Sequence, residues 1–151
     1  MVKIEIRELP FDPYAEITAY QQHALPPGHY GATASFVGTM RDFNDGKSVH
    51  GMTLEYYPGM TEKHIERICA QAATQWSLLD CLVIHRAGQI HINDAIVVIT
   101  TWATHRGDAL DACKFIIEDL KSKAPFWKKE ICEEGEAWVQ GNTSGYAGGE
   151  K

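Results

Sequence analysis

The strongest chemical signal in the sequence is a cluster of lysines around Pro125. Lys121, Lys123, Lys128 and Lys129 fall within nine consecutive positions, although the chain has only 14 basic residues in 151 and a net charge of −6. Lys121 and Lys123 have a simple structural explanation, because a positive side chain near the end of a helix stabilises its dipole by at most about 1 kcal/mol. Lys128 and Lys129 lie beyond the proline, where that explanation fails. We therefore interpret the cluster as a candidate anion-binding site.

Two other stretches carry basic residues that could complete such a site. His105 and Arg106 stand where a helix is expected to begin, and free backbone N–H groups, an imidazole and a guanidinium together form a suitable anion cradle. A solvated first helical turn explains these two residues equally well. Arg41 follows residues 38–40 at an expected strand end, and by itself it is uninformative because arginines beside loops are usually exposed.

Other types of site find little support in the sequence. None of the seven histidines belongs to an H-E-x-x-H motif or a Cys/His zinc knuckle, so we expect no metal site. The sequence has no glycine-rich phosphate loop and no G-x-S-x-G nucleophile motif. Carboxylates such as Glu55 and Glu130 could act as acids or bases, although most carboxylates only solvate a surface. The residues favour a site built on cations, and we expect no bound cofactor.

Length and composition restrict the class of protein. A chain of 151 residues, 44% hydrophobic and 23% charged, is expected to form one globular domain with a sizeable core. The longest apolar run, residues 95–99, is too short to span a bilayer, and the charged residues at positions 3, 5 and 7 do not fit a signal peptide. We expect a cytoplasmic protein with no membrane partner. The acidic net charge also disfavours nucleic acid as a partner.

Hydrophobic periodicity and turn residues predict the elements that must position the cluster. Alternating or β-branched residues predict strands over 2–7, from about 30, up to about 57, over 81–84 and over 95–99. A last strand is expected after the third helix, where the chain runs through 126–130 towards Trp138. Helical spacing predicts helices after Asp12–Pro13, after residues 58–59 and after Thr104, the last ending before Pro125. So many adjacent strands disfavour a doubly wound parallel sheet. They favour an α+β domain with a largely antiparallel sheet and three helices.

The same periodicity predicts which side chains are buried and where the domain ends. The inner faces of the first and third helices are expected to carry Tyr14, Ile17 and Ala24, and Leu110, Cys113, Ile117 and Leu120. The four cysteines are widely spaced in apolar surroundings, so we expect buried free thiols and no disulfide. Residues 142–151 are mostly small or polar. We therefore expect one domain over 1–141 and a flexible tail over 142–151.

Five segments of the chain, in the same order, resemble the catalytic (large) subunit of molybdopterin synthase. They are FVGTMR at 36–41, LEYYPGMTE at 54–62, IHRAG at 84–88, HR at 105–106 and LKSKAPFWKKE at 120–130. The resemblance extends from about residue 30 to residue 138. Any one segment would be weak evidence, whereas five in order are specific.

The resemblance implies a function, a fold and an assembly. Members of this family are sulfurtransferases of molybdenum cofactor biosynthesis, which convert cyclic pyranopterin monophosphate into molybdopterin by two sulfur transfers that form a dithiolene. The sulfur comes from the thiocarboxylated C-terminal glycine of a small ubiquitin-like partner subunit. The resemblance also implies an α/β hammerhead-like fold and a homodimer at the core of a heterotetramer.

The resemblance also assigns roles to individual residues. Lys121 matches a lysine regarded as essential and Lys128 a second active-site lysine, so both are expected to be catalytic. The expected substrate-binding residues are Thr39, Met40, Arg41, His105, Arg106, Lys129 and Glu130. Family members can carry an arginine a few residues beyond the position of Trp138, which would reach into the neighbouring subunit's site. Residues 139–142 of this chain contain no arginine, so either another cation replaces it or phosphate binding is weaker.

The implied chemistry agrees with a site built on cations. A thiocarboxylate and a phosphate are both anions, and two unit charges about 4 Å apart at an effective dielectric near 20 repel by about 4 kcal/mol. Fixed cations remove this penalty, and a lysine among other cations has a lowered pKa that suits proton transfer. An alternative function is a non-catalytic anion-binding subunit that only docks the acidic C-terminal tail of a partner protein. A third, an unrelated enzyme acting on phosphoesters, would need no protein partner.

Overall fold

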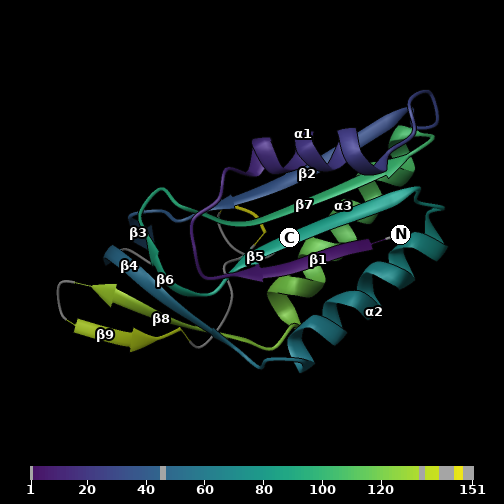
Figure 1. The fold of residues 1–151 in the computed structure, drawn as a ribbon. Coiled ribbons are helices and arrows are strands. Elements are labelled where there is room, and N and C mark those ends of the chain that lie inside the picture. The colour runs from purple at the N-terminus through teal and green to yellow at the C-terminus, as the bar shows by residue number, and fades with distance from the viewer. Residues whose placement is uncertain (1, 45–46, 133–134, 140–144, 148–151) are drawn as a thin grey trace.

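The computed structural model describes residues 2–44, 47–132, 135–139 and 145–147 (Figure 1). The helices in this part of the chain are α1 (Pro13–Ala24), α2 (Met60–Gln75) and α3 (Arg106–Ser122). The strands are β1 (Val2–Arg7), β2 (Ala32–Thr39), β3 (Phe43–Asn44), β4 (Lys47–Tyr56), β5 (Asp80–Arg86), β6 (Gly88–His91), β7 (Ala95–Ala103), β8 (Phe126–Cys132) and β9 (Gly135–Trp138). None of the helices described is long and apolar enough to cross a membrane.

The strands form two sheets. The first has the order β1-β5-β7-β2 and is antiparallel except between β1 and β5. The second has the order β3-β4-β8-β9, with β6 also paired to β4, and it is antiparallel throughout. Figure 1 shows α1 on one face of the first sheet, α2 and α3 on the other, and the second sheet alongside. The expected α+β class is confirmed, with two sheets where one was expected.

The hydrophobic core lies in three parts, and one of them supports the loop between the sheets. The largest part fills the space between the first sheet and helices α2 and α3, and includes Ile65, Ile99 and Ile116. A second part lies under α1. A third part joins the two sheets, and it holds Met40 and Met52. Because Met40 is anchored there, the chain that follows β2 is held at the junction of the two sheets.

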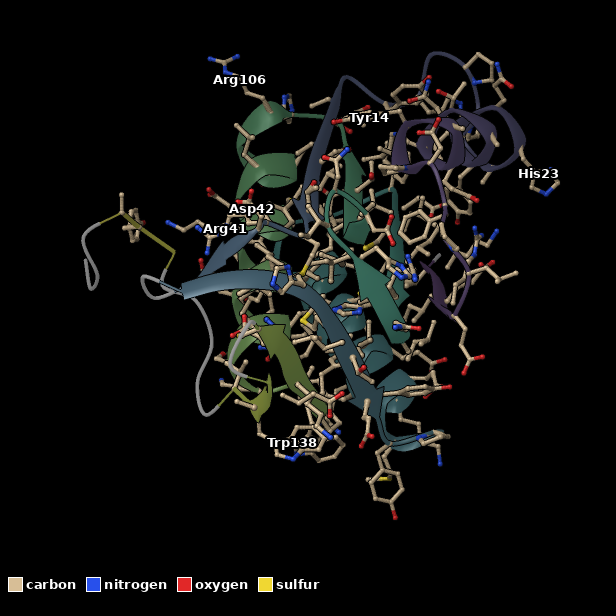
Figure 2. All side chains as sticks on the ribbon, turned by 90° about the vertical axis from the view of Figure 1, so that its left-hand side faces the viewer. Tyr14, His23, Arg41, Asp42, Arg106 and Trp138 are labelled. Carbon is tan, nitrogen blue, oxygen red and sulfur yellow. The ribbon has the colours of Figure 1, made fainter. Side chains whose placement is uncertain are left out.

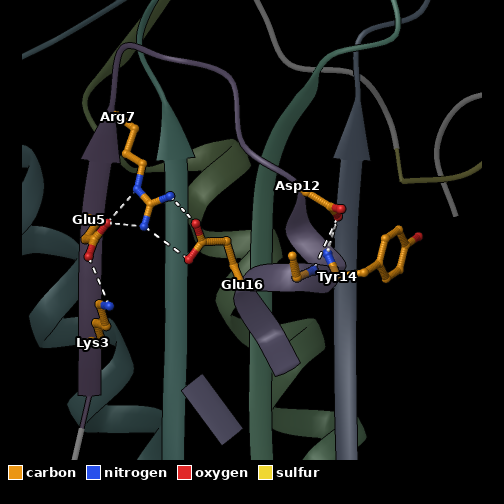
Figure 3. Close-up of polar contacts among 7 residues, drawn as sticks. Lys3, Glu5, Arg7, Asp12, Tyr14 and Glu16 are labelled. Carbon is orange, nitrogen blue, oxygen red and sulfur yellow. Dashed lines mark hydrogen bonds and ion pairs between the residues drawn. The ribbon is translucent and has the colours of Figure 1, made fainter. Parts of the chain in front are cut away.

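Helix boundaries follow the sequence closely, but two core positions were wrongly predicted. Asp12 is the expected N-cap of α1, and its carboxylate accepts hydrogen bonds from the backbone N–H groups of Tyr14 at 3.0 Å and Ala15 at 3.3 Å (Figure 3). Tyr14, however, is 68% exposed and points to solvent (Figure 2). Leu110 is 60% exposed, because α3 packs against the first sheet through small residues such as Ala109 and leaves the larger side chain outside.

The cysteines are free thiols, as expected, and three of the four are buried. Cys69 of α2 and Cys81 of β5 lie with their sulfur atoms 3.8 Å apart in the core. The hydrogen bond with Cys69 and burial raise the pKa of the Cys81 thiol well above its usual range, and burial raises that of Cys113 to about 11. These two groups therefore carry almost no thiolate at neutral pH. Cys132, at the end of β8, is only partly buried.

The expected tail and its boundary can be compared with the structure only in part. Residues 140–144 and 148–151 lie outside the described residues, so the expected boundary at 141 and the flexibility of 142–151 stay predictions. The described residues 145–147 lie near α3, because the Lys114 Nζ donates a hydrogen bond to the Tyr146 hydroxyl at 3.4 Å.

A glycine before β2 provides a test of how closely the segment packs. The Gly31 N–H donates to the carbonyl oxygen of Ala103 at 3.0 Å, and a Cβ at Gly31 would collide with the carbonyl oxygen of Thr104. We expect Gly31→Ala to lower the free energy of unfolding in urea by about 1–3 kcal/mol. Gly107→Ala is the control, because a Cβ there has open space and helix propensity favours alanine. Equal stability of the two variants would contradict this packing.

Candidate active site

A pocket of about 390 Å³ lies where the end of β2, the last turns of α3 and the inner face of β8 meet. Its apolar wall comes mainly from β2 and from the core that joins the two sheets. Its polar and charged lining residues are Thr39, Arg41, Glu118, Lys121, Lys128 and Glu130. No three His, Cys, Asp or Glu side chains of the described residues come together as metal ligands would. The three basic residues described at the pocket, Arg41, Lys121 and Lys128, outnumber the two carboxylates there, so the pocket can hold an anion.

The turn from α3 into β8 sets the two pocket lysines against each other. Lys121 lies in the last turn of α3, and Lys128 lies on β8, where it pairs with Leu54 of β4. Between them, the carbonyl oxygen of Pro125 accepts a hydrogen bond from the Thr61 hydroxyl at 3.0 Å, which ties the turn to α2. Side chains alternate along a strand, so Lys128 faces the pocket while its neighbours face away. Pro125 cannot continue a helix, so α3 ends shortly before it and the chain turns back into β8.

The two lysines lie close enough for each amine to shift the pKa of the other. Burial, the positive charge of Lys128 and the hydrogen bond with its amine lower the pKa of Lys121 to about 8. Burial also lowers the pKa of Lys128, although the hydrogen bond with Lys121 and the negative charge of Glu130 oppose that change. Lys121 thus exchanges its proton near neutral pH, which suits a general acid or base.

A buried histidine lies beside this pair and was not identified from the sequence as a site residue. The ring of His85, on β5, stacks on Phe126 with centroids 4.0 Å apart, and its Nδ1 lies 2.8 Å from the carbonyl oxygen of Arg86. Burial, together with the charges of Lys121 and Lys128, lowers the pKa of His85 to about 3, and the hydrogen bond with Arg86 acts against this shift. His85 is therefore neutral and packs as a flat ring. The sequence pointed to His85 only through its position in the segment 84–88, one of the five that carry the resemblance.

The strand end that carries Arg41 is held by its backbone. The Met40 N–H donates to the carbonyl oxygen of Asp94 at 2.9 Å, and the Asn93 N–H donates to the carbonyl oxygen of Met40 at 2.9 Å. The Met40 side chain is also buried, so Met40 lines the pocket from a fixed position. Arg41 itself is exposed at the edge of the pocket, next to Asp42 (Figure 2).

The structure brings together most, but not all, of the residues expected to form the site. Those that line the pocket are Thr39, Met40, Arg41, Lys121, Lys128 and Glu130. Lys129 lies on the opposite face of β8, where its Nζ is 2.9 Å from a carboxylate oxygen of Glu136 and 5.3 Å from the ring centroid of Trp138. The sequence analysis did not identify Glu118, which also lines the pocket. As one carboxylate among many along α3, it gave no signal.

His105 and Arg106 lie at the other end of α3 from Lys121. Fifteen residues separate Arg106 from Lys121, and at 1.5 Å per residue this places them about 22 Å apart along the helix axis. Figure 2 shows Arg106 pointing into solvent at that end. A single chain therefore does not bring His105 and Arg106 to the pocket, and their role in substrate binding stays a prediction.

The charge coupling between the two lysines can be tested by removing one of them. We expect Lys128→Met to raise the pKa of Lys121 above 8, because the neighbouring positive charge is lost, while burial keeps the pKa below 10.5. The measurement is an NMR titration of the lysine side chains. Lys123→Met is the control, since Lys123 is exposed and outside this pocket. An unchanged Lys121 pKa in Lys128→Met would contradict the coupling.

The chain is similar to known proteins both in sequence and in structure. The family described as MoaE protein matches residues 6–123 of the chain. The molybdopterin synthase catalytic subunit of Pseudomonas aeruginosa is 45% identical over 148 residues, which cover 98% of this chain and 97% of that protein. The molybdopterin biosynthesis MoaE protein from Burkholderia ambifaria has a similar structure, with a TM-score of 0.78 at 44% identity, covering 97% of this chain and 95% of that one.

A more distant structure shares the fold. It is a protein–protein complex of subunits 1 and 2 of the molybdopterin-converting factor from Helicobacter pylori, with a TM-score of 0.76 at 23% identity, covering 91% of this chain and 90% of that one. The likeness in fold, together with the sequence matches over almost the whole chain, leads to one conclusion. This chain belongs to the MoaE family, the catalytic subunits of molybdopterin synthase.

Proposed function

We propose that this chain transfers sulfur to cyclic pyranopterin monophosphate and so forms the dithiolene of molybdopterin. The sulfur donor is the thiocarboxylated C-terminus of a small ubiquitin-like subunit, and the reaction takes place in the cytoplasm. The observation that carries the proposal is the pair of amines, Lys121 and Lys128, in one pocket with Arg41. A member of this family needs such a set because both of its reactants are anions.

The pocket deals with the repulsion between the reactants by placing cations among them. At about 4 Å and an effective dielectric near 20, the repulsion is about 4 kcal/mol, which slows a reaction about a thousandfold. In our proposal, Lys128 and Arg41 hold the negative charges. Lys121, with a pKa of about 8, gives its proton to the oxygen that leaves the pterin carbon as the carbon–sulfur bond forms. Water then cleaves the acyl carbon–sulfur bond, which leaves the sulfur on the pterin and a carboxylate on the small subunit.

The partner in this proposal is a small subunit whose tail enters the pocket. The Helicobacter pylori neighbour is a complex of two subunits of the molybdopterin-converting factor, and we propose an assembly of the same kind here. The pocket holds both an apolar wall and cations, which suits an extended tail that ends in a negative charge. The chain would form the homodimeric core of a heterotetramer, with one small subunit for each copy.

The second copy in that assembly has a specific task. His105 and Arg106 are exposed and about 22 Å from Lys121 along α3, so they can contribute to a pocket only in a neighbouring copy. We propose that the start of α3 of one copy completes the pocket of the other. Arg106 would then supply a cation that residues 139–142 of this chain do not provide.

The catalytic role can be separated from simple docking of an acidic tail. The purified chain is mixed with a thiocarboxylated small subunit and cyclic pyranopterin monophosphate, and dithiolene product is measured. We expect Lys121→Arg to lose about 100-fold or more in turnover, because arginine keeps the charge but does not release its proton. Lys123→Ala, an exposed position two residues along, is expected to retain full turnover. Normal turnover by Lys121→Arg would show that only the charge of Lys121 matters, and a wild-type chain that binds the small subunit but forms no dithiolene would favour the docking function.

The sharing of pockets between copies can be tested with mixed dimers. One copy carries Lys121→Ala and the other carries Arg106→Ala, and the dimer is isolated with two affinity tags. If each pocket takes Arg106 from the other copy, one pocket has both defects and one has none, so about half of the wild-type turnover is expected. If each pocket takes Arg106 from its own chain, both pockets are defective. Turnover no higher than in the single-variant homodimers would therefore overturn shared pockets.

A further inference from the structure

A buried arginine outside the pocket connects, through one turn, to the strand end that carries Arg41. Arg86, the last residue of β5, is only 1% exposed. Its Nη1 donates to the carboxylate of Asp94 at 3.3 Å, and its Nη2 donates to the carbonyl oxygen of Gln89 at 2.8 Å. The guanidinium therefore holds both β6 and the turn that follows it.

The Asp94 carboxylate organises that turn. It also accepts a hydrogen bond from the backbone N–H of His91 at 3.0 Å, and the backbone N–H of Asp94 donates to the carbonyl oxygen of His91 at 3.0 Å. Asn93 adopts a left-handed conformation with φ of 74°, a conformation that asparagine tolerates better than most residues. The turn is thus tight, and its one link to a buried charge is the contact between Asp94 and Arg86.

This turn also holds Met40, the residue just before Arg41. Both backbone hydrogen bonds of Met40 go to this turn, to Asp94 and from Asn93, as described above. On the other side of Arg41, the carbonyl oxygen of Asp42 accepts a hydrogen bond from the Val49 N–H at 2.9 Å. Arg41 therefore stands between two backbone anchors, and the first anchor depends on the turn.

We propose that the ion pair of Arg86 and Asp94 positions Arg41 for anion binding, as a pair of residues that do not themselves touch the substrate. Stability is a poor explanation for the pair, because burying a guanidinium costs free energy that one partly exposed carboxylate offsets only in part. The Nε atom of Arg86 is buried and has no hydrogen-bond partner among the described residues, which adds to that cost. The pair instead fixes the turn. The turn fixes Met40, and Met40 fixes the position of Arg41.

The test uses Asp94→Asn, which keeps the shape of the side chain and removes its charge. Inorganic phosphate is the probe, and its dissociation constant is measured by NMR titration. We expect binding about tenfold weaker than in the wild type, because a loosened Arg41 must be ordered on binding. In the assay of dithiolene formation, the KM for cyclic pyranopterin monophosphate should rise by a similar factor with kcat within about twofold. The Met40 amide should exchange its hydrogen faster, while amides of the core remain protected.

A matched control comes from the ion pair that joins α1 to β1. Glu16 of α1 pairs with Arg7 of β1 through a two-pronged contact, one prong of which measures 3.2 Å (Figure 3). Its side chain is 27% exposed, against 24% for Asp94. Glu16→Gln therefore removes a carboxylate charge of similar exposure from a pair whose arginine side chain is 27% exposed, against 2% for Arg86, and phosphate binding and the KM should stay unchanged. An equal loss in Glu16→Gln would overturn the proposal.

A second variant separates positioning from stability. In the double variant Arg86→Met, Asp94→Leu, both charges are gone, so we expect unchanged or higher stability in urea together with weaker phosphate binding. Wild-type phosphate affinity in this variant or in Asp94→Asn would overturn the proposal. If the double variant fails to fold, Asp94→Asn alone decides. The role of Arg41 rests on the proposed function, but a wild-type chain that fails to form dithiolene would defeat that function only, because phosphate binding and hydrogen exchange still test the positioning.

Discussion

Two amines held close together in a partly buried pocket are the constraint on which the rest of this structure depends. Burial and mutual repulsion both act against the charged form of Lys121, and this is why its pKa falls to about 8. An arriving anion relieves the repulsion. A site with this property binds negative groups strongly only when the surrounding chain keeps the amines in place, so the parts of the fold around the pocket serve first to hold them there.

The two lysines are held in place by elements that are distant from one another in sequence. The end of α3 supplies Lys121, the turn tied to Thr61 reverses the chain, and pairing of β8 with β4 fixes the side of the strand on which Lys128 lies. The flat neutral ring of His85 packs on Phe126, next to that turn. The described part of the chain thus surrounds the lysines with neutral or backbone groups, apart from Arg41 and two carboxylates.

Sequence reasoning predicted the element order, the helix boundaries and the lysine cluster, because each leaves a local pattern. It could not predict which of Lys128 and Lys129 faces the pocket, since that depends on the pairing of β8 with β4. It grouped His105 and Arg106 with Lys121 because the resemblance does so, although a 17-residue helix separates them within one chain. The short strands β3, β6 and β9 were not predicted as separate strands, because two to four residues are too few to show a hydrophobic period. The sequence also gave no sign that Arg86 is buried.

The closely packed thiols of the core have a consequence for a protein that handles activated sulfur. When the donor's sulfur has bonded to the pterin, the donor tail is held as a thioester, and an accessible thiolate nearby could take its acyl group and release the pterin thiolate too early. Cys81 and Cys113 are buried and keep their protons, and Cys69 is buried beside them, so these three residues offer the incoming donor no competing nucleophile. Burial of these three thiols leaves the transferred sulfur to the pterin rather than to the core of the chain.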